Sequence, residues 1–231
     1  MQKFQAFSDL SNKDAPVRGY LHPSKHPDAG CLILTHGAGA NCESPLLMAL
    51  ADAFNSHGWM VLRCDLPFRQ SRPHGPPPRG SAERDQAGLR AAVAAMRRLT
   101  ASPVALGGHS YGGRQASMLA AAEPNLVEKL LLLSYPLHPP KKPAELRTKH
   151  FQSLQVPAMF VHGLRDEFGT IAEMQSALSL IPARTDLLPI VGAGHELLTK
   201  NNGESLIEQV TSRFISGFAT FTHAKTDDPT Q

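Results

Sequence analysis

Short apolar runs alternate with longer segments of helical period from residue 30 almost to the end of the chain. The runs occupy residues 31–34, 59–62, 104–106, 130–133, 158–161 and 187–191. Each run is apolar on both faces, which is the pattern of a parallel strand covered by helices on both sides. Six such units predict an α/β fold, a doubly wound and mostly parallel sheet with helices on both faces and right-handed crossovers.

The helical segments carry start and stop signals. Ser44 followed by Pro45 predicts a helix start, and Gly58 predicts where that helix ends. Thr170 and Glu173 form a capping-box pattern ahead of a helix that stops before residue 182. Further helices are expected over residues 81–99, 110–123 and 206–218. The first thirty residues leave room for an antiparallel hairpin at the sheet edge, through residues 17–21.

The length of 231 residues favours one domain, because domains of this class commonly hold roughly 100–200 residues or slightly more. A core of that size folds without disulfides or a structural metal. We expect a single domain over residues 1–221 and a polar, disordered tail over residues 222–231. Two segments rich in proline are expected to be loops, over residues 72–80 and 136–154.

Charge and hydropathy exclude two classes of protein. Lys and Arg number 23 against 20 Asp and Glu, and this net charge of +3 is spread along the chain, unlike a clustered nucleic-acid surface. The longest aliphatic stretches, such as residues 130–133, are far shorter than the roughly 20 residues that cross a bilayer. Neither nucleic acid nor membrane is therefore an expected partner.

The three cysteines, Cys31, Cys42 and Cys64, are odd in number and contain no C-x-x-C pair. That pattern fits a reducing compartment better than a disulfide framework. The first ten residues lack the apolar core and cleavage site of a secretory signal. We therefore expect a cytoplasmic location.

Residues 108–112, with the sequence GHSYG, match the pattern G-x-S-x-G. The pattern alone is weak, but here a predicted strand precedes it and a predicted helix follows it at once. A sharp strand-to-helix turn of this kind holds a serine in a strained conformation, with flanking glycines that allow close approach. Ser110 is therefore the candidate nucleophile, although an ordinary glycine-rich turn would have the same composition.

A serine hydroxyl needs a base, and the base needs an orienting acid. After a turn of this type the acid and then the histidine follow later in the chain. Asp166 lies four residues past one strand end, and His195 lies at the same offset past the last strand. Because strand C-terminal ends share one edge of the sheet, we expect both to meet Ser110 there. Glu167 is the alternative acid, and Asp186 is disfavoured because it starts a strand.

The sequence THGAGA of residues 35–40 follows the first buried strand and fits a loop that supplies an oxyanion donor. We expect the backbone N–H of Tyr111 as one donor and that of Ala38, or alternatively Gly39, as the second. A phosphate loop is excluded, because neither GxxxxGK[ST] nor a full GxGxxG pattern follows the strand. Candidate substrate contacts in the same region are His36, Gly37, Gly39 and His109.

Four histidines, at positions 36, 109, 162 and 195, are expected near strand ends, which raises the question of a metal. No carboxylate or cysteine stands beside them at ligand spacing, so we expect neither metal nor cofactor. Four arginines surround the proline-rich loop and offer charge for an anionic substrate, although a solvated basic loop is favoured. They are Arg63, Arg69, Arg72 and Arg79.

Together these motifs resemble the α/β-hydrolase superfamily, and within it the small, capless, dienelactone-hydrolase-like group of predicted hydrolases. The resemblance spans nearly the whole chain. It implies that Ser110, Asp166 and His195 are nucleophile, acid and base. Dienelactone hydrolases proper use a cysteine nucleophile, so the serine here argues against dienelactone as substrate. The matching motifs are HGAG at 36–39, GHSYG at 108–112, HGxxD at 162–166, and GH at 194–195.

The sequence therefore predicts a serine hydrolase that cleaves carboxylic esters or related acyl groups of a small-molecule substrate through an acyl-enzyme. The segment 136–154 is too short for a large cap, so we expect an open site. The alternative is a binding or scaffold protein that keeps this fold without turnover. Oligomeric state, acyl size, and the choice among ester, thioester and amide are left open by the sequence.

Overall fold

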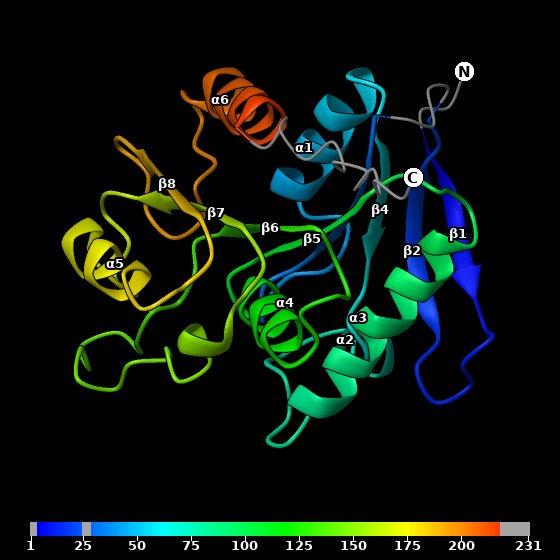
Figure 1. Cartoon of the computed structure of the whole chain (residues 1–231), viewed down its shortest axis with the longest axis horizontal. Helices are drawn as coiled ribbons and strands as arrows, with labels where there is room; N and C mark the ends of the chain where they lie inside the picture. Colours follow the sequence, from blue (N-terminus) through cyan, green and yellow to red (C-terminus); the bar gives the residue numbers. More distant parts are fainter. Residues whose placement is uncertain (1–3, 25–28, 218–231) are drawn as a thin grey trace, which may run out of the picture.

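An eight-stranded sheet runs through a computed structural model of the chain, of which residues 4–24 and 29–217 are described here (Figure 1). The strands are β1 (Gln5–Asp9), β2 (Val17–His22), β3 (Cys31–Thr35), β4 (Met60–Cys64), β5 (Val104–His109), β6 (Lys129–Leu133), β7 (Ala158–Gly163) and β8 (Thr185–Ile190). Their order is β1-β2-β4-β3-β5-β6-β7-β8. The pairs β1–β2 and β2–β4 are antiparallel and the other five are parallel. The predicted mostly parallel sheet is confirmed.

Burial along the strands follows their hydropathy. Every residue of β3, β5 and β7 is buried, as expected for runs that are apolar on both faces. The edge strands β1 and β8 are only partly buried. The hairpin expected within the first thirty residues is present as β1 and β2, and it extends the sheet on the β4 side.

Helices cover both faces of the sheet (Figure 1). They are α1 (Pro45–Ser56), α2 (Pro67–Ser71), α3 (Ala82–Arg97), α4 (Tyr111–Ala122), α5 (Ile171–Leu178) and α6 (Gly203–Ser216). Helices α1 and α6 pack over one core, and α3, α4 and α5 pack over the other. The sheet therefore separates two apolar layers, the arrangement that the two-faced hydrophobicity of the strands requires.

The predicted helix ends are largely reproduced. Thr170 and Glu173 form the reciprocal capping box at the start of α5. Gly58 follows α1 with φ 85°, a left-handed conformation that glycine adopts without a Cβ clash. Ser44 occupies the N-cap of α1, but its side chain makes no cap hydrogen bond, so Pro45 at the first turn is the operative signal there.

The differences from the predicted elements are short. Helix α2 and the 3-10 turn η1 (Phe151–Ser153) were not expected, because one turn leaves no hydrophobic period to detect. Within the described residues the segment between β6 and β7 holds only η1, so no large cap is evident there. Phe218, the predicted domain end at residue 221 and the predicted tail 222–231 lie outside the described residues. Among the helices of ranges 4–24 and 29–217, none is long and apolar enough to cross a membrane.

Candidate active site

The turn between β5 and α4 brings Ser110 to the C-terminal edge of the sheet. Ser110 has φ 50° and ψ −113°, a strained backbone conformation for a residue with a side chain. Positions 108 and 112 require glycine, because other backbone atoms lie too close to leave room for a Cβ. A Cβ on Gly108 would lie 2.8 Å from the carbonyl carbon of Gly112, and one on Gly112 would lie 2.5 Å from the carbonyl oxygen of His36. The turn therefore has the geometry that the GHSYG sequence predicts.

Three side chains from three strand ends form a hydrogen-bonded chain. The Oγ of Ser110 lies 2.8 Å from Nε2 of His195. On the other side of the ring, Nδ1 lies 2.9 Å from Oδ2 and 3.0 Å from Oδ1 of Asp166. A carboxylate only accepts, so Nδ1 carries the proton and Nε2 is free to accept from the serine hydroxyl. Ser110, His195 and Asp166, singled out from sequence order, are thus in direct contact.

The carboxylate of Asp166 is fully buried, and His195 is partly open to solvent. Burial alone would raise the pKa of Asp166, but hydrogen bonds from His195 and from the backbone N–H of Phe168 outweigh it and lower the pKa. Asp166 is therefore ionised and able to stabilise a protonated imidazole. Glu167 is exposed, and Asp186 pairs with Arg213 at 2.6 Å, so neither alternative acid reaches the ring.

Two neighbouring rings hold His195 in place. The ring of Phe168 lies 4.2 Å from it between centroids, and the ring of His109 lies 5.3 Å away. His109 donates from Nε2 to the carbonyl of His195 at 2.9 Å. Burial lowers the pKa of His109, which keeps it neutral. His109 was a candidate substrate contact, but it is only 7% exposed and its hydrogen bond goes to the His195 backbone.

The loop after β3 borders the serine directly. A Cβ on Gly37 would lie 3.1 Å from Nδ1 of His109 and 3.5 Å from Cβ of Ser110. Ala38 and Gly39 form the centre of a turn closed by the Ala40 N–H and the Gly37 carbonyl at 3.2 Å. The two candidate N–H donors of the loop, Ala38 and Gly39, therefore follow directly after Gly37, the residue that lies beside Ser110.

Tyr111, whose N–H is the other candidate donor, is the first residue of α4. Its hydroxyl donates to Asp85 at 2.7 Å, and Asp85 also accepts the N–H of Phe68 at 3.0 Å. Phe68 packs edge-on against both Tyr111 and His36. The short helix α2 thus touches both sides of the candidate oxyanion site.

His36 does not fit its predicted role as a substrate contact. Its side chain is fully buried, Nδ1 donates to the Gly37 carbonyl at 2.8 Å, and Nε2 accepts the N–H of Leu66 at 3.1 Å. Burial lowers the pKa of His36, so the ring is neutral, as this donor and acceptor pair requires. Both ring nitrogens are used inside the protein, which leaves none for a ligand.

The basic loop is only partly solvated. Arg72 and Arg79 are exposed, but Arg63 and Arg69 are buried, which corrects the prediction for these two. Arg63 donates to the Cys42 carbonyl. Arg69 donates to backbone carbonyls of the loop after β3. The sequence showed four arginines near one loop, but gave no signal that two of them turn inward.

No group of three His, Cys, Asp or Glu side chains is arranged to hold a metal ion in the described part of the chain. His162 is buried, and its Nε2 donates to the Gly169 carbonyl at 2.7 Å. His36, His109 and His195 have the partners given above. His36, His109 and His162 therefore bind backbone carbonyls of loops, whereas His195 bonds to the side chains of Ser110 and Asp166.

Comparison with known proteins assigns the chain to a family. The family model described as the alpha/beta hydrolase domain matches residues 28–223, so the chain belongs to the α/β-hydrolases. A Haemophilus influenzae protein provisionally named an esterase/lipase is 35% identical over 102 residues, which are 44% of this chain and 33% of that protein. This chain therefore matches about a third of the length of that curated relative.

Solved structures share the fold across almost the whole chain. A dienelactone hydrolase from Anabaena variabilis is 19% identical with a TM-score of 0.73, covering 93% of this chain and 99% of that one. Est1E from Butyrivibrio proteoclasticus is 17% identical with the same TM-score and the same two coverages. An alpha-beta serine hydrolase homologue from Coxiella burnetii is 15% identical with a TM-score of 0.71, covering 93% and 97%. At these identities the likeness is one of fold.

Proposed function

We propose that the protein is a serine hydrolase that cleaves carboxylic esters or related acyl substrates. The observation that carries the proposal is the continuous chain from Ser110 Oγ through His195 to Asp166, at 2.8 and 2.9 Å. A nucleophile within hydrogen-bond reach of a base, itself oriented by a third group, is the arrangement that activates a serine.

In the first step Ser110 Oγ attacks the carbonyl carbon of the substrate while His195 Nε2 takes the hydroxyl proton. Asp166 stabilises the imidazolium through the Nδ1–H bond and keeps the ring in the required tautomer. The negative charge that develops on the carbonyl oxygen is met by the N–H of Tyr111 and by that of Ala38 or Gly39. One such donor contributes about 3 kcal/mol to transition-state stabilisation.

In the second step His195 gives its proton to the leaving alcohol, which leaves an acyl group on Ser110. Water then takes the place of the alcohol. His195 removes its proton as it attacks the acyl carbonyl, and the same N–H groups stabilise the second tetrahedral intermediate. The acid leaves, and the serine hydroxyl is restored.

The substrate is proposed to be a small acyl compound that enters an open site, since the segment between β6 and β7 forms no large cap in the described residues. Dienelactone is disfavoured, because the nucleophile is a serine here. The related fold of Est1E has been solved with ferulic acid bound. Aryl and alkyl esters of increasing acyl length are therefore the first panel to try, followed by thioesters and amides.

The test is intact mass after incubation with a fluorophosphonate, which phosphonylates activated serines. One adduct per chain is expected on the native protein, and none on Ser110→Ala. The variant should keep its melting temperature within a few degrees and lose ester hydrolysis. Absence of an adduct on the native protein would favour the non-catalytic scaffold instead.

A further inference from the structure

The orientation of the N–H groups in the loop after β3 decides whether they can serve an oxyanion. A trans peptide places its N–H and its C=O on opposite edges of one plane. The described residues contain no cis peptide bond. Whatever holds the carbonyl of residue 37 therefore sets the direction of the Ala38 N–H, and whatever holds the carbonyl of Ala38 sets that of Gly39.

The first of these two carbonyls is held by His36 and by the turn itself. The Gly37 carbonyl accepts from His36 Nδ1 at 2.8 Å and from the Ala40 N–H at 3.2 Å. The peptide between residues 37 and 38 is thus fixed from inside the core.

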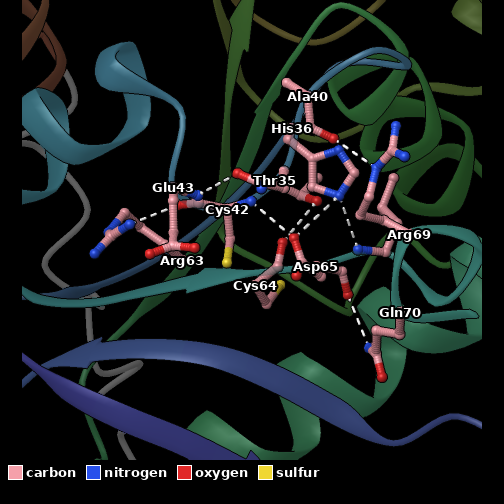
Figure 2. A network of polar contacts seen from close by, with 12 residues as sticks. Thr35, His36, Ala40, Cys42, Glu43, Arg63, Cys64, Asp65, Arg69 and Gln70 are labelled. Atoms are coloured by element: carbon pink, nitrogen blue, oxygen red, sulfur yellow. Dashed lines mark hydrogen bonds and ion pairs between the residues drawn. The ribbon is translucent and has the colours of Figure 1, made fainter. Parts of the chain in front are cut away.

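The second carbonyl is held by a residue outside the loop. Arg69, on α2, donates from Nη2 to the Ala38 carbonyl at 2.7 Å and from Nε to the Ala40 carbonyl, also at 2.7 Å. Figure 2 shows its guanidinium against the loop, beside the ring of His36. The bond to the Ala38 carbonyl fixes the peptide between residues 38 and 39, so the Gly39 N–H is turned away from Arg69, and the bond to the Ala40 carbonyl anchors the loop one peptide further on.

Arg69 is itself held firmly. Its Nη1 donates to the Arg72 carbonyl at 2.9 Å, and Nη2 also donates to the Gly75 carbonyl at 3.0 Å. The guanidinium carbon lies 4.9 Å from the ring centre of Phe68, and the residue is 5% exposed. Four of its hydrogen bonds go to backbone carbonyls, which a lysine ammonium with its three donors on one atom could not reproduce.

Helix α2 and the loop are also joined by two contacts that do not involve Arg69. The N–H of Leu66 donates to His36 Nε2, and the N–H of Cys42 donates to Asp65 Oδ1 at 2.7 Å (Figure 2). Removal of the Arg69 guanidinium should therefore release two carbonyls of the loop without separating α2 from it.

A cation on the carbonyl side of a peptide also strengthens its N–H as a donor, because hydrogen bonds polarise one another along a chain. The orientation of the N–H group and its strengthening as a donor both act on the transition state more than on the bound ester, which carries no charge at that oxygen.

We propose that Arg69 is a positioning residue of the hydrolytic site, which keeps the Gly39 N–H preset for the oxyanion by holding the Ala38 carbonyl, with the Ala40 carbonyl as a second anchor of the same loop. This proposal rests on the proposed serine hydrolase activity. It predicts that loss of Arg69 lowers kcat and leaves KM nearly unchanged, because Arg69 acts through the loop and makes no contact with substrate.

The experiment compares Arg69→Gln and Arg69→Lys with Arg84→Gln, which removes the same charge from an exposed position on α3. Active sites are first counted with the fluorophosphonate, so that kcat refers to folded, reactive protein. We expect kcat of Arg69→Gln to fall about 10- to 100-fold with KM within about threefold, Arg69→Lys to be intermediate, and Arg84→Gln to match the native protein.

A second readout measures how well the site binds a tetrahedral adduct that resembles the oxyanion. An alkylboronic acid forms a tetrahedral adduct on the serine, and its Ki should rise in both Arg69 variants in proportion to the loss of kcat/KM. Unchanged kcat per titrated site in Arg69→Gln, or in Arg69→Lys if the glutamine variant does not fold, would overturn the proposal. If the native protein is not labelled at all, the proposed activity fails before Arg69 is tested, so the two failures are distinguishable.

Discussion

The two sides of the candidate active site are built in different ways. On one side Ser110, His195 and Asp166 each follow a strand end, and their side chains meet through two direct hydrogen bonds. On the other side the loop after β3 presents backbone N–H groups, whose directions depend on His36 and Arg69 holding carbonyls from behind. The first side consists of the candidate catalytic side chains, whereas the second consists of backbone N–H groups whose orientation is set by other residues.

This difference explains why one side is readable from the sequence and the other is not. Residue type and position past a strand end suffice to find the triad, since parallel strands deliver their C-terminal ends to one edge. A carbonyl acceptor is present at every position, so the sequence does not say which carbonyl Arg69 will bind. The partners of Arg69 in the loop after β3 lie 29 and 31 residues away and have no residue-type signal.

The largest expected effect comes from breaking the side that carries the reactive groups. Asp166→Asn removes the charge that stabilises the imidazolium and allows the wrong tautomer of His195, so kcat should fall roughly 10⁴-fold. Steady-state ester hydrolysis, normalised to folded protein, measures it. The matched control is Glu167→Gln, one position along and exposed, which should be close to native. If the control lost more activity than Asp166→Asn, the acid would be misassigned.

A pH experiment tests His150, a partly buried residue that directly precedes η1 in the segment between β6 and β7. Burial, with a smaller effect of Arg114, lowers the pKa of His150 to about 4, and Nε2 lies 2.8 Å from Ser117 Oγ. An unfolded histidine titrates near pH 6.5. Between these values the unfolded chain binds a proton that the folded chain does not, so the free energy of unfolding falls as the pH falls.

The contribution of His150 should be complete above pH 6.5 and lost by pH 4, by about 3 kcal/mol at most. Urea unfolding of His150→Gln across this range should show a shallower loss than the native protein, and the exposed His74→Gln should show the native slope. Equal slopes for His150→Gln and the native protein would mean that His150 titrates normally.

The smallest expected effect comes from disturbing the contact between the loop after β3 and the start of α4. A Cβ at Gly112 would lie 2.5 Å from the His36 carbonyl oxygen and 2.7 Å from Thr35 Cγ2, so Gly112→Ala must push the loop after β3 away from α4. We expect a loss of about 1–3 kcal/mol in the free energy of unfolding, together with reduced activity. Gly203→Ala, whose Cβ meets only Leu198 at 3.6 Å, is the control. A native melting temperature for Gly112→Ala would show that the two sides adjust freely.

The fold was predictable because strands that are apolar on both faces must be covered by helices on both sides, which few folds allow. The six apolar runs became β3 to β8, and the residues expected in an edge hairpin became β1 and β2. The one-turn helix α2 was missed, although its Pro67 at the first turn is a helix-start signal. Five residues carry too little periodicity to separate a helix from a loop, and α2 is held by distant partners, Asp85 and the Ala40 carbonyl.

Within the site, the errors share one cause. His36 and His109 were expected to face the substrate because histidines near a catalytic motif often do, but both are buried and bind backbone carbonyls. Whether a polar side chain turns toward solvent or toward the core depends on the loops that surround it. Those loops come from distant parts of the sequence, so residue type and spacing do not decide it.

Acylation of Ser110 during turnover is the step that most directly tests the proposed hydrolase activity. Native protein should be mixed rapidly with a p-nitrophenyl ester, quenched in acid within the first turnover, and digested for peptide mass analysis. We expect one acyl group per chain, on the peptide that contains Ser110, matched by a burst of one p-nitrophenolate. Ester hydrolysis with no acyl group on that peptide would contradict it.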